Sequence, residues 1–316
     1  MIKENKIIFI APRYFNYHNI IVDALEKKGF SVDFLEDKNS GLIYNLSRKS
    51  SFLTKRYLDN YRKEVISKLE ATSYDIMIVI GGKTLDSDFW KFINKTYNFK
   101  KVLYQWDSVR NFDYRGMIAS FDSVKTFDSE DAKELEIGYL PLFYKEEPKK
   151  TVVEDLDLMF VGIWHSDRLE ILNEIAKYAD ASNLKYIFKV YHPWYVYLYM
   201  VYVKKTLKNS PFFIHQPIPL EETISYYDRA KCIVDINHPG QSGMTMRTIE
   251  TIGMGKKLIT TNSFIKTECF FDPNRIQVID RKNIQINSDF FSFHNAYENI
   301  DMLEINNWVT ELLKSR

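Results

Sequence analysis

Cysteine is scarce in this chain. Only Cys232 and Cys269 occur among its 316 residues, and they form no CxxC pair and no Cys/His cluster with the spacing of zinc ligands. Cys232 stands in the apolar run KCIVDI, which indicates a small buried core residue. The scarcity argues against a zinc-binding protein and predicts a chain that stays reduced in the cytoplasm.

Net charge and long apolar runs are lacking as well. The formal net charge is +1, so no global field attracts a polyanion, and without a basic stripe we expect no nucleic-acid partner. No stretch approaches the ~20 apolar residues that span a bilayer. The N-terminal stretch MIKENKIIFIAPRYF is too short in its apolar part for a signal peptide, and Pro12 and Arg13 interrupt it. We therefore expect a cytoplasmic protein.

Aromatic residues, in contrast, are abundant. The chain contains 21 Tyr and 22 Phe residues, enough to build large cores and to stack against rings. Its length is about twice that of a usual domain, which predicts two domains.

The first half of the chain alternates short apolar runs with helix-length amphipathic segments. Continuous apolar, β-branched runs of this kind are typical of a parallel sheet covered by helices on both faces. The clearest run is YDIMIVIGG at 74–82, and helices are predicted near 19–28 and 53–71. The other predicted strands are 6–11, 30–35, 101–107, 122–127 and 136–142.

A charged stretch with a proline, KEEPKKTVVED at 145–155, predicts a linker, and a second α/β series follows it. Its predicted strands are 157–162, 185–191, 211–215, 231–237, 256–262 and 275–280, and its helices are 166–178, 220–230 and 243–254. We expect an α/β protein with Rossmann-like domains at 1–148 and 149–316, whose terminal helix packs across either domain. Two such domains facing across a cleft would bind ligands at the carboxyl ends of their strands.

The most informative segment is HPGQSGMTMRTIETIGMGKKLITTN at 238–262. Its first six residues predict a loop in which glycines let backbone N–H groups approach a ligand. A helix predicted to begin near Gly243 would present its N-terminus to an anion. On that helix Gly243, Arg247 and Glu250 share one face, so Arg247 could pair with phosphate and Glu250 with a ribose diol. The alternative is an ordinary βαβ turn with a surface Arg–Glu pair.

The stretch GQSGMTMRTIETIGMGKKLITTN resembles the donor-binding segment of GT-B glycosyltransferases, and more narrowly that of bacterial lipopolysaccharide or capsular polysaccharide biosynthesis enzymes. YDIMIVIGG, LYQWDSVRN, FDSVKTFDSEDA and DLMFVGIWHSDR fit the same group. The resemblance implies the GT-B fold and a nucleotide diphosphate sugar donor, with UDP among the candidate nucleotides. It implies that Glu250 binds the ribose and that residues 241–247 hold the pyrophosphate. The donor contacts expected here are His238, Gln241, Ser242, Gly243, Met244, Thr245, Arg247 and Glu250.

One position departs from the family pattern. Retaining GT-B enzymes commonly carry a pair of glutamates flanking this loop, whereas Gln241 or Ser242 fills the first position here. Retention or inversion of the sugar therefore stays open.

The stretch DLMFVGIWHSDR at 157–168 opens the second domain as a phosphate-binding Rossmann turn does. Gly162 ends the strand, Ser166 is placed to cap the next helix and Arg168 lies in its first turn. His165, Ser166 and Arg168 would then lie near the donor phosphates. The alternative is a plain helix start with Asp167 at the helix dipole and Arg168 in solvent.

Lys189, in the strand KYIFKVYHP, is another candidate for neutralising the diphosphate. The alternative is an edge strand in which Lys185 and Lys189 share a water-facing side.

Two residues are candidates for a general base. His18 stands in the loop after the first strand, where inverting GT-B enzymes often place a base, and a neutral histidine could accept the proton of an acceptor hydroxyl. Asp107, at the end of KVLYQWD, is the rival base, or with Trp106 forms a platform for an acceptor sugar. The alternatives are a histidine at a helix start and an aspartate that caps a helix or turn.

Asp155 and Asp157 match the Asp-x-Asp string with which metal-dependent glycosyltransferases hold a cation. We interpret the match as accidental, because Asp157 opens a buried strand. We expect no metal and no cofactor, with a helix dipole, Arg and Lys in place of the cation.

The stretch HPWYVYLYMVYVKKTLKN at 192–209 combines aromatic residues with Lys204, Lys205 and Lys208. Such a helix could lie on an anionic membrane. The alternative is a buried helix with a basic end.

Together these features predict the transfer of a sugar from a nucleotide diphosphate sugar to a surface-glycan acceptor, free or lipid-linked. Two alternatives stay open: a GT-B sugar-nucleotide epimerase, and a non-catalytic nucleotide-sugar-binding subunit of a polysaccharide assembly complex. The expected localisation is the cytoplasm, with peripheral contact at the inner face of the membrane as the variant.

Overall fold

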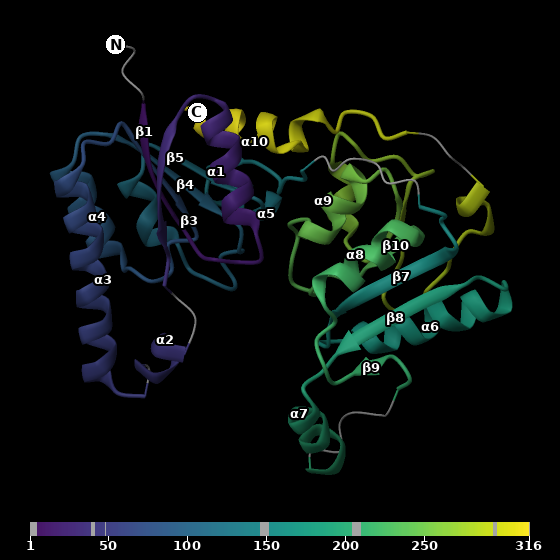
Figure 1. Cartoon of the computed structure of the whole chain (residues 1–316). Coiled ribbons are helices and arrows are strands. Elements are labelled where there is room, and N and C mark those ends of the chain that lie inside the picture. The colour runs from purple at the N-terminus through teal and green to yellow at the C-terminus, as the bar shows by residue number, and fades with distance from the viewer. Residues whose placement is uncertain are drawn as a thin grey trace. The chain divides into compact units, whose positions relative to one another are not determined.

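The computed structural model describes residues 5–38, 42–47, 49–145, 152–203, 210–292 and 296–315. The chain forms two compact units (Figure 1). Unit 1 comprises Met1–Lys145 together with Asp301–Arg316, and unit 2 comprises Glu146–Ile300. The boundary predicted between residues 148 and 149 lies outside the described residues.

Unit 1 is built on a six-stranded sheet in the order β2–β1–β3–β4–β5–β6, and all of its strand pairs are parallel. The strands are β1 (Lys6–Ala11), β2 (Ser31–Glu36), β3 (Ile76–Ile80), β4 (Lys100–Gln105), β5 (Ser123–Thr126) and β6 (Gly138–Tyr139). Each lies within or beside the apolar run that predicts it. The last strand is much shorter than the predicted 136–142, and Pro141 in that range has no N–H for a ladder.

Helices cover both faces of this sheet, as the uninterrupted apolar strands predict. Val65 of α3 and Trp90 of α4 belong to the core on one face, together with Ile8 and Val79. The α-helices before residue 145 are α1 (Tyr17–Lys27), α2 (Leu42–Ser47), α3 (Ser51–Ala71), α4 (Ser87–Thr96) and α5 (Ser129–Glu134), with a 3₁₀ helix η1 (Arg115–Ser120). Asp86 caps α4, since its carboxylate accepts a 2.9 Å hydrogen bond from the backbone N of Phe89.

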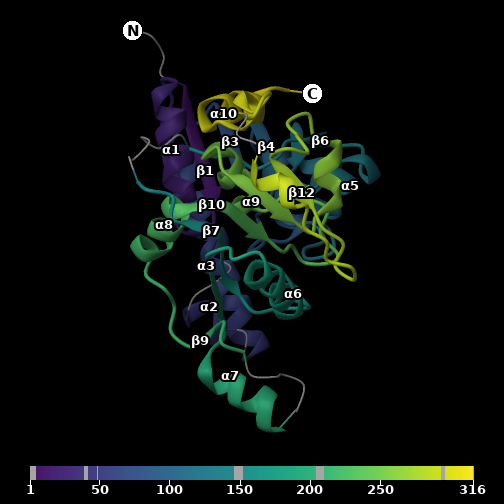
Figure 2. The same ribbon diagram turned by 90° about the vertical axis from the view of Figure 1, so that its right-hand side faces the viewer.

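The C-terminal helix α10 (Ile305–Leu313) follows the 3₁₀ turn η5 (Asp301–Leu303) and packs on unit 1 beside α1 (Figures 1 and 2). Its Trp308 is fully buried and lies edge-on to Tyr104 of β4, with 4.9 Å between ring centroids. The Trp308 indole N–H donates to the carbonyl of Pro141 at 2.8 Å. The apolar face of α10 therefore packs on the first domain, although this helix follows the second domain in the sequence.

Unit 2 repeats the architecture with a second six-stranded parallel sheet, in the order β12–β11–β10–β7–β8–β9. Its strands are β7 (Leu156–Ile163), β8 (Tyr186–Tyr191), β9 (Phe213–Ile214), β10 (Ala230–Asp235), β11 (Lys257–Thr260) and β12 (Ile276–Val278). Its helices are α6 (Arg168–Ala181), α7 (Trp194–Leu198), α8 (Leu220–Arg229) and α9 (Met246–Gly253), with the π-helical turn η2 (Tyr199–Val203) and the 3₁₀ turns η3 (Ser263–Thr267) and η4 (Ser288–Ser292). The predicted pair of Rossmann-like α/β domains is confirmed.

Two predicted helix starts in unit 2 are wrong. Helix α9 begins at Met246, because the hydroxyl of Thr245 accepts a hydrogen bond from the N of Thr248 at 3.1 Å and caps the helix there. Gly243 consequently lies in the preceding loop and not on the helix face of Arg247 and Glu250. Ser166 does not cap α6: its φ of +45° lies in the left-handed region, and the helix begins at Arg168.

Among the described residues, no helix is both long enough and apolar enough to cross a bilayer.

Candidate functional site

The strongest candidate site lies in unit 2, at the carboxyl ends of neighbouring strands. Strands β7 and β10 are hydrogen-bonded in parallel, so the loops that follow them emerge at the same edge of the sheet. Helix α6 starts after β7, and helix α9 starts after β10. Two helix N-termini, each with backbone N–H groups that lack intrahelical partners, are thereby placed at one edge.

Arg247, on the first turn of α9, is tied to the ends of both strands. Its Nη1 donates to Oδ1 of Asp235 at 2.9 Å, and its Nη2 donates to the carbonyl of Val161 at 2.6 Å. Its Nε donates to the Tyr227 hydroxyl at 3.2 Å. The partner Asp235 has no exposed surface. Arg247 is therefore not the solvent-facing residue of an ordinary βαβ turn.

Arg168, the first residue of α6, is also buried, with 6% of its surface exposed. Its Nη1 donates to the carbonyl of Ile163, and its Nη2 donates to the carbonyl of Ile236 at 2.5 Å. Its Nε is buried and has no hydrogen-bond partner. Burial and the neighbouring charge of Arg247 lower the pKa of Arg168 to about 9. The alternative in which Arg168 is solvated is wrong.

A third arginine, Arg281, follows β12 and completes this group. Its Nη1 donates to Asp167 at 2.7 Å, and its Nη2 donates to the Asn237 side-chain oxygen at 2.7 Å. Sequence reasoning missed Arg281, Asp167 and Asn237. Arg281 could have been found as a cation directly after the predicted strand 275–280. Asn237 is the last residue of the predicted strand at 231–237, and the composition of that strand indicates only a place in the core.

We call Arg168, Arg247 and Arg281 the arginine cluster. The carboxylates that act on Arg168 are Asp235 and Asp167, so three positive charges meet two negative ones. A Cβ atom on Gly162 would lie 3.0 Å from Nη2 of Arg247 and 3.3 Å from Nη1 of Arg168. Two guanidinium groups thus lie against one glycine, where larger side chains would collide with them.

His165 lies at the same edge, with its ring centroid 5.9 Å from that of His238. Burial and the nearby charges of Arg168, His238 and Arg247 lower the pKa of His165 to about 4. Its Nδ1 lies 2.9 Å from the hydroxyl of Ser166. His165 is thus held neutral by burial and by the cations around it, and the cations add positive charge to this edge, an environment that suits an anion.

The loop between β10 and α9 is shaped by two asparagines. The Asn237 amide donates to the carbonyl of Gln241 at 2.8 Å, and the Asn262 amide donates to that of Ser242 at 2.9 Å. Ser242 is buried, and so is Met244, which has 1% of its surface exposed. The Met244 side chain thus belongs to the core, which leaves only the backbone of this residue for the predicted donor contact.

The remaining predicted donor contacts occupy different positions. His238 is exposed at the beginning of this loop. The Thr245 hydroxyl donates to Asp235 at 2.9 Å and caps α9, which is a structural role.

Glu250 is half-buried one helical turn after Arg247. Lys189 is half-buried on β8, paired in register with Val161 of β7, and β8 is an inner strand rather than an edge.

Unit 1 holds the two predicted base candidates, in different surroundings. His18, the second residue of α1, has 7% of its surface exposed, and its ring lies 4.9 Å from the Phe34 ring. Burial lowers the pKa of His18, and its Nδ1 has no hydrogen-bond partner. Asp107 follows β4, retains 31% of its side-chain exposure and pairs with Lys83 at 2.5 Å. Of these two candidates, Asp107 is therefore the more accessible.

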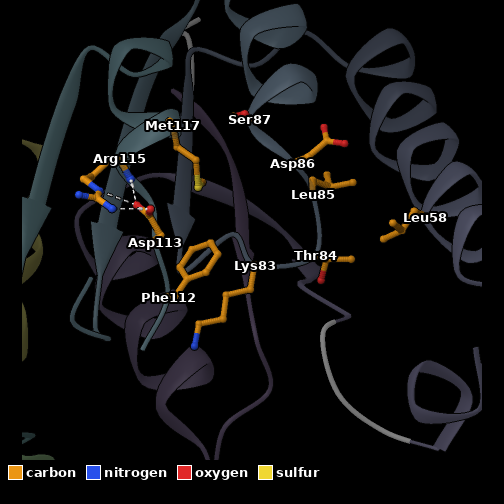
Figure 3. A pocket seen from close by; sticks show the side chains of 11 residues that line it. Leu58, Lys83, Thr84, Leu85, Asp86, Ser87, Phe112, Asp113, Arg115 and Met117 are labelled. Atoms are coloured by element: carbon orange, nitrogen blue, oxygen red, sulfur yellow. Dashed lines mark hydrogen bonds and ion pairs between the residues drawn. The ribbon is translucent and has the colours of Figure 1, made fainter. Parts of the chain in front are cut away.

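Lys83 also lines a pocket of about 430 Å³ in unit 1 (Figure 3). Figure 3 shows Lys83 beside Phe112, with Asp113 paired to Arg115 above them. The loop that carries Lys83 is held by buried Asp37, which accepts hydrogen bonds from the backbone N of Lys83 at 2.9 Å and of Thr84 at 3.2 Å. Neither Asp37 nor Lys83 was predicted from the sequence. The Gly-Gly-Lys-Thr string directly after β3 could have identified Lys83 as a candidate site residue.

The Asp-x-Asp string is engaged in surface ion pairs. Asp155 pairs with Arg229 at 2.7 Å and Asp157 with Lys231 at 2.8 Å. Across the described parts of the chain, no three His, Cys, Asp or Glu side chains gather as a metal site would require.

Comparison with known proteins gives matches in structure alone. No family model matches the chain, and no curated protein matches it in sequence. The UDP-GlcNAc 2-epimerase from Neisseria meningitidis, bound to UDP-GlcNAc, aligns over 98% of this chain and 99% of its own, with a TM-score of 0.59 and 9% identity. The UDP-GlcNAc 2-epimerase from Methanocaldococcus jannaschii aligns over 98% and 99%, with a TM-score of 0.55 and 14% identity.

The glycotransferase of kitacinnamycin aligns over 99% of this chain and 100% of its own, with a TM-score of 0.51 and 8% identity. Likeness at such identities shows the fold. The chain has the GT-B fold, with two Rossmann-like domains, as the resemblance in the sequence implies.

Proposed function

We propose that this protein is a glycosyltransferase that takes its sugar from a nucleotide diphosphate sugar. The observation that carries the proposal is the arginine cluster, in which three guanidinium groups converge on the loops after β7, β10 and β12. The buried and unpartnered Nε of Arg168 adds a donor without an acceptor. A buried donor of this kind is costly to leave unpaired, and a diphosphate oxygen would satisfy it.

The chemistry that follows is stabilisation of a leaving nucleoside diphosphate. Negative charge develops on the diphosphate as the bond to the sugar breaks, and prepositioned donors lower the barrier because they need no reorganisation. Arg168 is held by backbone carbonyls, and Arg247 by Asp235 and a carbonyl, so both are fixed before the ligand arrives. The N-termini of α6 and α9 at the same edge favour the same charge.

Glu250 is proposed to bind the ribose. It lies one helical turn beyond Arg247 and on the same side of α9, the spacing between a diphosphate and its ribose that the sequence resemblance implies. Structurally similar proteins crystallised with UDP-GlcNAc make UDP the first nucleotide to test. The acceptor proposed from the same resemblance is a surface glycan of the lipopolysaccharide or capsule type.

If the transfer inverts the sugar, we assign the general base to Asp107. Its carboxylate retains exposed surface, whereas His18 is buried against Phe34. Lys83 at 2.5 Å keeps the Asp107 carboxylate in place. A base must reach the proton that it removes, which favours the accessible group.

The proposal is tested by thermal unfolding with UDP, GDP, CMP, TDP and ADP, with and without EDTA. We expect one nucleotide to raise the Tm, with no effect of EDTA, and the gain to shrink in Arg281→Lys and Glu250→Ala. Arg229→Ala, which removes an exposed arginine of unit 2 that pairs with Asp155, is the matched control and keeps the gain. If no nucleotide raises the Tm of the wild type, the proposed donor site is wrong.

Product analysis then separates transfer from epimerisation. A transferase releases the nucleoside diphosphate and lengthens the acceptor, whereas an epimerase returns an altered sugar without any acceptor. Binding without either product would indicate a non-catalytic nucleotide-sugar-binding subunit.

A further inference from the structure

Helix α7 and the π-helical turn η2 form one short continuous helical segment, Trp194 to Val203, that follows β8 in unit 2. One side of it is anchored. Tyr197, Met200 and Val201 pack against the core that contains Phe188 and Val190. The Tyr197 ring lies 5.5 Å from the Phe213 ring and 4.8 Å from the His215 ring. The orientation of the segment is therefore set by packing on its own unit.

The other side of the segment is apolar and exposed to solvent. Six side chains have between 41% and 72% of their surface exposed, and their spacing of i, i+1, i+4, i+5, i+8 and i+9 places them on one helical face. They are Trp194, Tyr195, Leu198, Tyr199, Tyr202 and Val203. The outer face of a helix on a globular protein in water is normally polar. A contiguous apolar face of this kind marks a surface that binds something.

The segment also projects from its unit. In Figures 1 and 2, α7 lies beyond β9, at the end of unit 2, and extends away from the sheet. The predicted alternative of a buried helix is wrong, since one full face is exposed.

Charge and residue type indicate what this face binds. Residues 181–220 contain five lysines and no aspartate or glutamate, although the whole chain is almost neutral. Three of these, Lys204, Lys205 and Lys208, follow the helical segment in the sequence and lie outside the described residues. Four of the six exposed side chains are Trp or Tyr, whose rings are apolar and whose tips are polar. Such side chains accumulate at the level of lipid headgroups.

We propose that the face formed by Trp194, Tyr195, Leu198, Tyr199, Tyr202 and Val203 docks on an anionic lipid bilayer. The segment lies in the plane of the headgroups with its aromatic face embedded, and the lysines that follow it in the sequence attract the acidic lipids. The face is distinct from the arginine cluster, so its binding does not depend on the proposed donor site. A glycan acceptor on a lipid anchor would meet the enzyme at this surface.

The test is flotation of the full chain with two kinds of vesicle, one of phosphatidylcholine alone and one that also contains phosphatidylglycerol. We expect flotation with the phosphatidylglycerol vesicles and its weakening as salt is raised. The double substitution Trp194→Ser with Tyr199→Ser is expected to weaken partitioning roughly tenfold or more, because two rings no longer enter the apolar layer. Phe52→Ser, which removes an exposed aromatic of α3 in unit 1, is the matched control and floats like the wild type.

Three outcomes would overturn the proposal. The first is a wild type that does not float with phosphatidylglycerol vesicles. The second is a double variant that floats as well as the wild type. The third is a wild type that is dimeric in solution and becomes monomeric in the double variant, which would make the face a self-association surface. Thermal unfolding of the double variant, with and without nucleotide, checks that unit 2 remains folded and that its donor site is unchanged.

Discussion

Arg247 and Asp235 form an ion pair of 2.9 Å in which the carboxylate has no exposed surface. The second oxygen of Asp235 accepts hydrogen bonds from the hydroxyls of Thr245 at 2.9 Å and Thr248 at 2.8 Å. One carboxylate therefore joins the end of β10 to the cap and first turn of α9. The pair fixes the Arg247 guanidinium and holds the helix that carries it.

We predict that Asp235→Asn lowers the free energy of unfolding by about 3–5 kcal/mol, because it leaves the Arg247 charge buried without its counter-ion. Chemical denaturation measures this loss. The control is Asp155→Asn, which removes an exposed carboxylate from its pair with Arg229 and should change stability by about 1 kcal/mol or less. Equal losses in the two variants would contradict a special role for the buried pair.

The low pKa of His165 predicts a pH dependence of stability. In the unfolded chain His165 titrates near 6.5, and in the folded protein its pKa is about 4. Between these values the unfolded state binds more protons, so this residue lowers stability as the pH falls from about 6.5 to about 4 and adds no further loss below that. His165→Gln removes the contribution, and unfolding across this pH range should show a shallower decline than in the wild type.

The comparison for this measurement is His215→Gln, an exposed histidine that follows β9. The stability of the His215→Gln variant should decline over this pH range as steeply as that of the wild type. If His165→Gln and the wild type decline in parallel, the imidazole is not held neutral by its burial and the neighbouring arginines.

Gly162→Ala should weaken nucleotide binding by about tenfold, or about 1.4 kcal/mol. The added Cβ would lie 2.9 Å from Cζ of Phe160, 3.0 Å from Nη2 of Arg247 and 3.3 Å from Nη1 of Arg168, so the Phe160 ring has to shift. Both guanidinium groups lie over that ring, and a shift of the ring disturbs their placement. Titration calorimetry with the nucleotide found in the thermal screen measures the change. Gly116→Ala, which places a Cβ against Ser87 in unit 1, is the control and should bind with unchanged affinity. An unaffected Gly162→Ala variant would argue against a ligand beside these two arginines.

Asp107→Asn is predicted to lower kcat by about 10²- to 10⁴-fold if the enzyme inverts, because the acceptor hydroxyl loses its base. Nucleotide affinity should persist, since the proposed donor site belongs to unit 2. The rate of nucleoside diphosphate release, with a lipid-linked glycan fraction as acceptor, provides the measurement. His18→Gln should keep most of the activity. The reverse pattern, with His18→Gln inactive and Asp107→Asn active, would reassign the base.

Much of the fold could be predicted because its signals are local. Each strand is a short run of apolar residues, and burial on both faces of a parallel sheet requires that composition wherever the strand lies. KIIFIA coincides with β1, and YDIMIVIGG contains β3. The chain order of strands and helices then leaves few arrangements besides two doubly wound units.

The candidate site was predictable only in part. Arg168 and Arg247 stand in motifs that indicate a phosphate site, and the structure brings them together at Gly162. Arg281 was missed because it enters the cluster from β12, after more than a hundred residues of intervening chain. The burial of the Met244 side chain was not predictable, because a loop residue next to a glycine can point into the core or out of it, and local sequence does not distinguish the two.

The sequence by itself determined the two α/β units, the approximate positions of their strands and an arginine at the start of each of α6 and α9. Only the tertiary structure decided that α9 starts at Met246, capped by Thr245, that the last helix packs on the first unit, and that the aromatic face of α7 and η2 is exposed. Periodicity shows that a segment has an apolar face. Which surface covers that face depends on contacts between residues far apart in the chain, and no local pattern records them.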